Sequence, residues 1–107
     1  MKPKIDGTTF GSIMISGKEY EHDVLIRLDG KVKKRKKKLS KSIYGTSHIV
    51  SPDEAKHVFE KGAKHLIVGT GQSGALGLSD DAAAYFEKHD CSVRLLPTPK
   101  AVAAWNS

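Results

Sequence analysis

The sequence contains little cysteine and no long apolar segment. Cys91 is its one cysteine, so an internal disulfide is excluded and a zinc site built from cysteine pairs is not expected. No apolar run approaches the roughly 20 residues that a membrane-spanning helix needs, and the charged N-terminus lacks the apolar stretch of a secretory signal. We therefore predict a cytoplasmic protein that holds no metal ion and does not enter a membrane.

Aromatic residues are also few, at 7% of the chain, while hydrophobic residues make up 38% and charged residues 28%. This composition is that of an ordinary folded protein rather than of a disordered or fibrous one. The length predicts one domain covering residues 1–107. A chain of this size buries roughly two-thirds of its unfolded surface and needs no disulfide or metal to fold.

The net charge of +6 hides an uneven distribution, since 18 Lys and Arg stand against 12 Asp and Glu. Eight of the bases lie in the segment 31–41, which contains no acidic residue: Lys31, Lys33, Lys34, Arg35, Lys36, Lys37, Lys38 and Lys41. The rest of the chain has ten bases against twelve acids and carries a net charge of −2. The sequence is therefore that of a mildly acidic domain with one strongly basic segment.

The N-terminal half is predicted to be a β meander. Apolar alternation predicts a strand at 10–15 and a second strand at 20–28. Asp29-Gly30 predicts a two-residue type I′ turn, because both central positions of that turn need a positive φ. The segment 31–38 would then be a third strand, and its many bases predict an exposed sheet edge.

The C-terminal half is predicted to alternate between helices and strands. Ser51 and Glu54 form a capping box for a helix that ends at Gly62, while Ser79 and Thr98 cap two further helices. The expected elements are helices at 51–62, 79–89 and 98–105 and strands at 65–68 and 93–96. Strands that alternate with helices pair in parallel through right-handed crossovers, so we predict an α/β fold.

A glycine-rich loop follows the strand predicted at 65–68. Its pattern, G-x-G-x-x-G, is the first part of the dinucleotide-binding fingerprint. No helix opens directly after the loop and no acidic residue follows the next strand, so we expect no cofactor. Glycines at the end of a strand also let backbone amides converge on an anion. The candidate ligand-binding residues are therefore Gly69, Thr70, Gly71, Gln72, Ser73 and Gly74. The alternative is a turn whose glycines only permit tight passage of the chain.

The same loop approximates the G-x-S-x-G nucleophile elbow, with Ser73 as the serine and Ala75 in place of the last glycine. A hydrolase also needs a histidine base, and His89 follows the loop in chain order. The five histidines show no metal-binding or triad spacing, so no catalytic residue is assigned. The alternative is an enzyme acting on a phosphorylated or acyl substrate, which would need Ser73, Gln72, His48 and a carboxylate in one pocket.

The basic segment, Lys31 to Lys41, allows two interpretations. The candidate polyanion-binding residues are Lys33, Lys34, Arg35, Lys36, Lys37 and Lys38, because basic side chains release counterions when they contact phosphates. No aromatic residue lies between them to stack on bases, and Tyr44 is the nearest. We therefore expect weak, nonspecific binding, as in a nucleic-acid-associated protein. The simpler interpretation is an edge strand whose lysines prevent edge-to-edge aggregation.

Several motifs in a fixed order resemble a known family. They are Phe10-Gly-x-Ile-x-Ile-x-Gly, Tyr20 with Asp23-Val24, Tyr44-Gly-Thr-Ser-His48, Ile67-Val-Gly-Thr-Gly-Gln-Ser-Gly74 and Leu96-Pro-Thr-Pro-x-Ala-Val102. Together they span nearly the whole chain. They resemble the adipogenesis-associated Mth-type domain family, which includes small archaeal and bacterial proteins and a mitochondrial assembly factor for respiratory complex I.

The resemblance implies a three-layer α/β fold with a central mixed sheet, helices and an additional N-terminal β layer. It implies no established catalytic activity, and it directs attention to Thr46, Ser47 and His48, together with the loop 69–74, as parts of one cleft. Relatives usually continue beyond Asn106 with a further strand, so we expect that strand, and any site or interface it completes, to be missing here. We predict a non-enzymatic binding or assembly-type protein with an unidentified protein partner, and self-association stays open.

Overall fold

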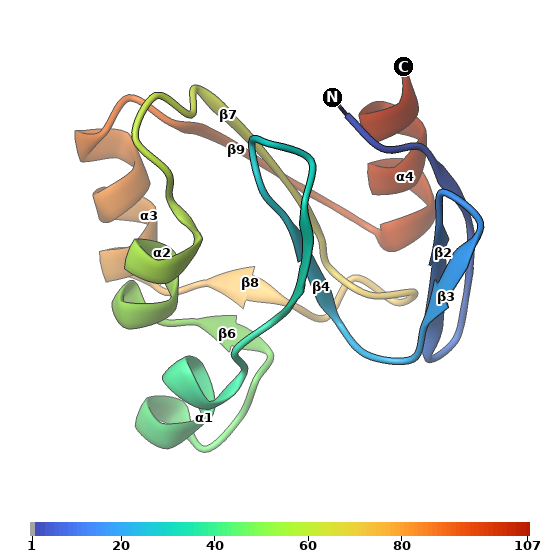
Figure 1. Cartoon of the computed structure of the whole chain (residues 1–107). Helices are drawn as coiled ribbons and strands as arrows, with labels where there is room; N and C mark the ends of the chain where they lie inside the picture. Colours follow the sequence, from blue (N-terminus) through green and yellow to red (C-terminus); the bar gives the residue numbers. More distant parts are fainter. Residues whose placement is uncertain (1) are drawn as a thin grey trace.

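The structure is a computed structural model that describes residues 2–107, and its elements lie in successive layers (Figure 1). Helices α2 (Pro52–Val58) and α3 (Asp80–Lys88) form one side. They pack against the strands β7 (His65–Gly69) and β9 (Ser92–Leu96). Helix α4 (Thr98–Asn106) covers the other side of these strands and separates them from an outer sheet.

The outer sheet and the connecting segments complete the chain. The outer sheet consists of β1 (Ile5–Thr9), β2 (Ser12–Ile15) and β3 (Lys18–Tyr20). The remaining elements are β4 (Val24–Ile26), β5 (Val32–Lys34), α1 (Lys38–Tyr44), β6 (Ile49–Val50) and β8 (Gly77–Leu78). Because α4 contacts both β7 and β1, it joins the outer sheet to the rest of the molecule.

The strands form four small sheets within residues 2–107. β7 and β9 pair in parallel from His65 opposite Ser92 to Gly69 opposite Leu96, and β6 pairs in parallel with β8. The sheets β1–β2–β3 and β4–β5 are antiparallel. The α/β class, the parallel pairing of β7 with β9 and the separate N-terminal β layer are confirmed. Within residues 2–107 the expected central mixed sheet is divided into shorter ladders, since β4 is paired with β5 and β7 with β9.

The hairpin turn before β5 differs from the prediction, as does the strand predicted at 20–28, which is split between β3 and β4. Arg27 N donates to Lys31 O and Gly30 N donates to Arg27 O, both at 2.9 Å. Gly30 has a φ of +89°, but Asp29 does not have a positive φ. The connection is therefore a type I turn followed by a left-handed glycine, and the predicted type I′ turn is wrong. Asp29 Oδ1 instead accepts a hydrogen bond from Lys31 N at 2.9 Å.

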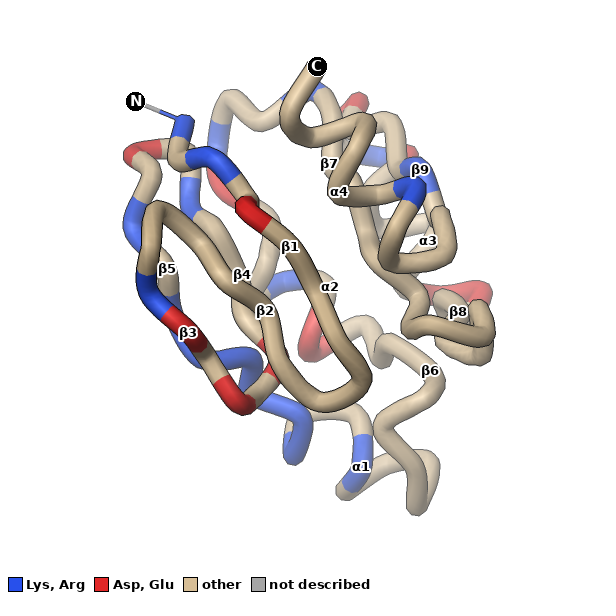
Figure 2. Tube along the Cα trace, turned by 90° about the vertical axis from the view of Figure 1, so that its right-hand side faces the viewer, with Lys and Arg blue, Asp and Glu red and all other residues tan. Residues whose placement is uncertain are grey.

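The segment predicted as a third strand from Lys31 to Lys38 contains only a short one. β5 covers Val32–Lys34 and α1 begins at Lys38, so the predicted length is wrong. The side chain of Arg35, next along the chain, turns inward and is only 11% exposed. Figure 2 shows the basic residues passing from β5 to α1. In the described part of the chain β5 pairs with β4 alone and is an edge strand, as predicted.

Helix α2 begins as predicted but ends earlier. Ser51 Oγ accepts a hydrogen bond from Glu54 N at 3.1 Å, which is the expected N-cap. The Glu54 carboxylate does not return to Ser51 N, because that amide donates to Ser40 Oγ at 2.9 Å, and the capping box is only half formed. The helix ends at Val58 rather than at Gly62, since the backbone becomes extended at the next residue.

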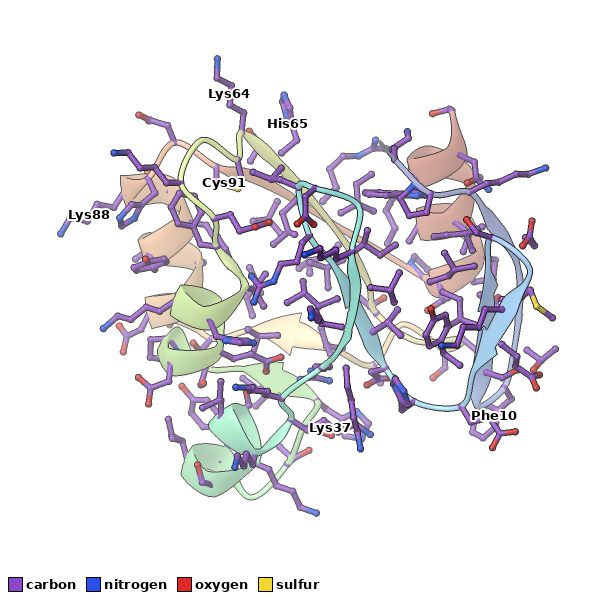
Figure 3. The ribbon with its side chains drawn as sticks, in the orientation of Figure 1. Phe10, Lys37, Lys64, His65, Lys88 and Cys91 are labelled. Carbon is purple, nitrogen blue, oxygen red and sulfur yellow. The ribbon has the colours of Figure 1, made fainter. Side chains whose placement is uncertain are left out.

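The main core lies between α2, α3 and the strands. Phe86 is the largest of its fully buried side chains and is 2% exposed. The other buried residues of this cluster are Val50, Ala55, Ala82 and Cys91. A second set of buried apolar side chains, from β1, β2 and α4, consists of Ile5, Ile15 and Ala101. Phe10, at the tip of the β1–β2 hairpin, is 94% exposed (Figure 3).

No helix in the described part of the chain is both long enough and apolar enough to cross a membrane.

Candidate functional site

The predicted site residues Thr46, Ser47 and His48 follow α1 and lead into β6. Thr46 Oγ1 accepts a hydrogen bond from His48 N at 3.1 Å, and Ser47 O accepts one from Arg35 Nη2 at 3.0 Å. The carbonyl of His48 accepts a hydrogen bond from Gly77 N at 2.9 Å, next to the ladder of β6 and β8. Because β8 follows the glycine loop, the structure brings the backbone of the two predicted motifs close together.

The glycine loop makes most of its backbone hydrogen bonds internally or with its neighbours. Thr70 N donates to Leu96 O at 2.8 Å, and Gly74 N donates to Gly71 O at 3.2 Å. Gly71 N donates to Thr98 Oγ1 at 3.0 Å. The Thr98 hydroxyl was expected to cap α4, but it holds the loop instead, and α4 begins without a side-chain cap. The loop is therefore fixed to both β9 and α4.

Two neighbouring amides of the loop, those of Gln72 and Ser73, have no acceptor within residues 2–107. Both residues are exposed, whereas Thr70 is only 5% exposed. Neighbouring free amides are the groups from which an anion nest is built. Neither of the two cavities described below is lined by residues 46–48 or 69–74. The small-anion site at the loop stays a prediction that depends on these two amides.

Each glycine of the G-x-G-x-x-G pattern has a structural reason. A Cβ on Gly69 would lie 3.2 Å from Thr98 Oγ1 and 3.7 Å from Ala101 Cβ, so Gly69 allows α4 to approach the end of β7. Gly71 and Gly74 have φ values of +95° and +74°, a region that favours glycine. Packing and backbone conformation therefore account for the pattern, which supports its interpretation as a tight turn.

Replacing Gly71 with Ala should lower the free energy of unfolding by about 1 kcal/mol, because a Cβ is strained in the left-handed region. No heavy atom lies within 4 Å of the Cβ position, so strain rather than a clash causes the loss. Gly77→Ala is the matched control, since its Cβ position is equally open and its φ is not positive. Urea denaturation of both variants measures the difference. Equal losses in the two variants would contradict this account of the loop.

The alternative catalytic arrangement centres on Ser73 and needs a histidine base. Ser73 makes no hydrogen bond to a histidine within residues 2–107, and it is exposed. His89 Nδ1 instead lies 2.9 Å from Tyr85 O, and the His89 ring stacks on Tyr85 with centroids 4.3 Å apart. An activated serine needs a base within hydrogen-bond reach. The described geometry gives Ser73 no such partner and makes His89 a packing residue at the end of α3.

Six lysines form an exposed basic surface on β5, α1 and the link between them. We define this basic surface as Lys33, Lys34, Lys36, Lys37, Lys38 and Lys41, all of which are exposed. In the described part of the chain only Lys37 has a carboxylate within reach, with its Nζ 3.9 Å from Asp23 Oδ2. An open cavity of about 530 Å³ lies in this surface and is also lined by Glu21 and His22. The positive charge is therefore mostly uncompensated.

Arg35 differs from the neighbouring lysines because it is committed to a buried ion pair. Its Nε donates to Glu54 Oε2 at 2.6 Å and its Nη2 donates to Glu54 Oε1 at 2.9 Å. Hydrogen bonding to Glu54 raises the pKa of Arg35, against the opposing effect of burial. Glu54 is 2% exposed and also accepts a hydrogen bond from Ser40 Oγ. Arg35 does not fit its predicted role as a polyanion contact, whereas the five lysines predicted with it do face solvent.

The comparisons with known proteins identify the family. The family model described as "Protein of unknown function (DUF498/DUF598)" matches residues 5–107. The chain belongs to this family. Among solved structures, the DUF498/DUF598 chain is similar to conserved hypothetical protein PH1505 from Pyrococcus horikoshii OT3, with 36% identity and a TM-score of 0.88. That match covers 94% of this chain and 84% of PH1505.

A second solved structure, MT938, is 31% identical to the DUF498/DUF598 chain with a TM-score of 0.79. The match covers 98% of this chain and 85% of MT938. The family is described as one of unknown function and PH1505 as a hypothetical protein, so the comparisons establish the fold and family and indicate no enzymatic activity.

Sequence reasoning missed two residues of the basic surface cavity in this DUF498/DUF598 protein, Glu21 and His22. They lie beside the lysines because Val24 pairs with Lys34 across β4 and β5. The pairing of the two strands was predicted, but the turn expected at Asp29-Gly30 was wrong, and this turn sets the register of the hairpin. The acidic Glu21 marks one boundary of the positive surface.

Two further titratable groups, the His57 ring and the thiol of Cys91 in the core, are kept neutral. Burial, with smaller contributions from Arg27 and Lys36, lowers the pKa of His57, so this ring adds no charge to the basic surface at pH 7. Burial raises the pKa of the Cys91 thiol, which keeps it protonated and unreactive. Neither group therefore adds positive charge beside the lysines.

Proposed function

We propose that this protein is a non-enzymatic binding protein that holds the phosphate backbone of a nucleic acid on its basic surface. The observation that carries the proposal is that five of its six lysines have no carboxylate within 4.0 Å in the described chain. Lysines in such a group displace counterions from a phosphate backbone, and this release drives binding that depends steeply on salt. The resemblance to the Mth-type family, which includes an assembly factor, also favours binding over catalysis. We place this activity in the cytoplasm.

The predominance of lysine on the basic surface favours a nucleic acid over a protein as the partner. Protein interfaces are depleted of lysine and enriched in aromatic residues and arginine. The basic surface contains six lysines, and the one arginine of its segment is buried against Glu54. No aromatic residue lies between the lysines to stack on bases. The binding should therefore follow the phosphate backbone and show little sequence preference.

The basic surface also rests on a fixed support. Arg35 joins the end of β5 to Glu54 of α2, and its Nη1 lies 3.3 Å from Asp23 Oδ2. Ser40 of α1 donates to the same Glu54 carboxylate. The backbone on either side of Arg35 is thus held in place by a buried network, so only the lysine side chains need ordering when a ligand binds.

Neutralising part of the basic surface should weaken binding to a fluorescein-labelled oligouridylate more than tenfold at about 50 mM salt. The variant replaces Lys34, Lys36, Lys37 and Lys38 with Gln. The slope of log affinity against log salt should fall by up to about 3, since each lost contact with a single strand contributes about 0.7. Fluorescence anisotropy at several salt concentrations measures both quantities.

The matched control replaces four exposed lysines elsewhere, Lys61, Lys64, Lys88 and Lys100, with Gln. It changes the net charge by the same amount, so it should lower the affinity much less. Equal losses in the two variants, or no binding by the unmodified protein at low salt, would overturn the proposal. If the lysines only guard the edge of β5, the first variant should self-associate while its RNA affinity equals that of the control.

A further inference from the structure

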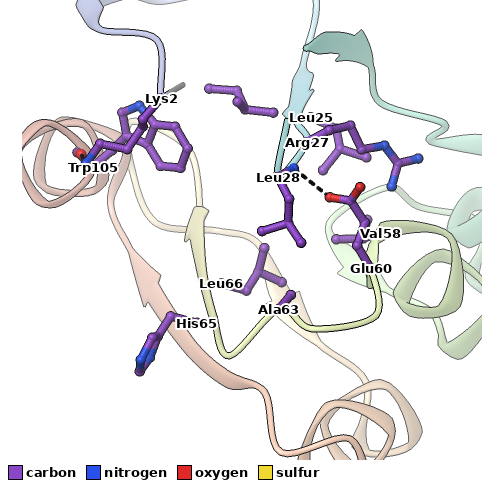
Figure 4. Close-up of a pocket in the computed structure, with 11 residues that line it drawn as sticks. Lys2, Leu25, Arg27, Leu28, Val58, Glu60, Ala63, His65, Leu66 and Trp105 are labelled. Carbon is purple, nitrogen blue, oxygen red and sulfur yellow. Dashed lines mark hydrogen bonds between the residues drawn. The ribbon is translucent and has the colours of Figure 1, made fainter. Parts of the chain in front are cut away.

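A second cavity, of about 230 Å³, lies where β4, the chain after α2, β7 and α4 meet (Figure 4). It is separate from the basic surface, and no lysine of that surface lines it. Its walls are mostly apolar and include Leu25, Leu28, Val58, Ala63, Leu66 and Trp105. The cavity is open to solvent, and its volume exceeds the roughly 150 Å³ of an enclosed apolar cavity that holds benzene, so it has room for a ring with a short polar arm.

Among the described residues β4 pairs with β5 and β7 pairs with β9, so the cavity lies at a seam that no strand pairing closes. Its two sides are nevertheless fixed. On one side Trp105 Nε1 donates to Pro3 O at 2.7 Å. On the other, Leu28 N donates to Glu60 Oε2 at 2.7 Å, and Leu28 is 60% exposed at the edge of the cavity. The walls are therefore formed without a ligand, as is usual for small-molecule sites.

The charged groups around the cavity are not balanced. Lys2 and Arg27 are two permanent cations, and Glu60 is the one carboxylate among the lining residues. Lys2 Nζ lies 5.2 Å from the Trp105 ring centroid and donates to the carbonyl oxygen of Trp105 and, at 3.4 Å, to the backbone oxygen of Ser107. An ammonium group has three donors, so one stays available. Figure 4 shows Lys2 and Trp105 on one side and Leu28 and Glu60 on the other.

From this arrangement we propose that the cavity binds a small carboxylic acid anion with an aromatic or branched aliphatic body. The body lies between Trp105, Leu28 and Leu66, and the carboxylate is directed to the Lys2 ammonium. A ligand with an amine instead of an acid would be repelled at Lys2, which is next to the aromatic wall. The cavity is thus a selective site for an amphipathic anion and does not depend on the proposed RNA binding.

Phenylacetate is the probe for this site, and Trp105 reports on it because it is the only tryptophan of the chain. Titration should change the fluorescence saturably, with a dissociation constant on the order of 1 mM for a ligand of this size. Benzylamine and benzyl alcohol, which share the ring, should bind at least about fivefold more weakly. Lys2→Gln should weaken phenylacetate about fivefold and leave benzyl alcohol unchanged.

Filling the cavity supplies the second test. Ala63→Leu should abolish the phenylacetate signal, and Ala84→Leu, on the exposed face of α3, should leave it intact. Leu28→Asp, at an exposed position of the wall, should weaken phenylacetate without disturbing folding, which circular dichroism checks. The quadruple lysine variant made for RNA binding should keep the phenylacetate signal. No saturable signal at about 10 mM ligand, or equal binding of benzylamine and phenylacetate, would overturn the proposal.

Discussion

Replacing Glu54 with Gln should lower the free energy of unfolding by about 3 kcal/mol. Glu54 is 2% exposed and receives two hydrogen bonds from Arg35 and one from Ser40. The substitution keeps the shape of the side chain but removes its charge, so Arg35 loses its buried counterion and keeps only the contact of its Nη1 with the exposed Asp23 carboxylate. A buried charge without a partner is costly because water no longer solvates it. Urea denaturation followed by circular dichroism measures the loss.

Asp53→Asn is the matched control, because Asp53 is an exposed carboxylate in the same helical turn. It should cost less than about 1 kcal/mol, the usual value for a charge at a helix N-terminus. Arg35→Met should also destabilise the protein, and combining it with Glu54→Gln should cost less than the sum of the two, since the charge left unpaired is then gone. A loss for Glu54→Gln no larger than that for Asp53→Asn would show that the ion pair contributes nothing.

One residue of the Arg35–Glu54 ion pair could be placed from the sequence, but the pairing itself could not. Glu54 was correctly placed in the first turn of a helix, because capping signals are local and lie within four residues. Its partner Arg35 is 19 residues away, and no local pattern joins the two. One signal was present: Arg35 is the only arginine among seven lysines in segment 31–41. Arginine is favoured where a carboxylate must be held by two parallel hydrogen bonds, and this could have marked the position as buried.

The glycine loop was located correctly, but the cause of its pattern was not visible in the sequence. The contact that requires Gly69 comes from Thr98 and Ala101 of α4, and Gly71 donates to Thr98 27 residues away. Such contacts depend on how α4 packs on β7, which periodicity does not specify. The same holds for the second cavity, whose lining extends from Lys2 to Trp105. Local elements were therefore predictable, whereas the sites formed between them were not.

The largest loss of stability should come from Phe86→Ala, at about 4 kcal/mol. Phe86 is 2% exposed and lies in the cluster that joins α2, α3 and the strands. Truncation removes a buried ring and leaves a cavity that neighbouring side chains from separate elements cannot easily fill. Because these elements form the support for both the basic surface and the glycine loop, the whole unfolding transition should shift to lower urea concentration.

Phe10→Ala is the matched control for Phe86→Ala, because it removes the same ring from an exposed position. Phe10 is 94% exposed at the tip of the β1–β2 hairpin (Figure 3), so its truncation should change stability by less than about 0.5 kcal/mol. Urea denaturation curves with equal slopes for the two variants would attribute the difference to burial, since the slope reports the surface exposed on unfolding. A comparable loss in both variants would contradict the placement of the core between α2, α3 and the parallel strands. The packing of α2 and α3 on β7 and β9 would then not be the main source of the free energy of unfolding.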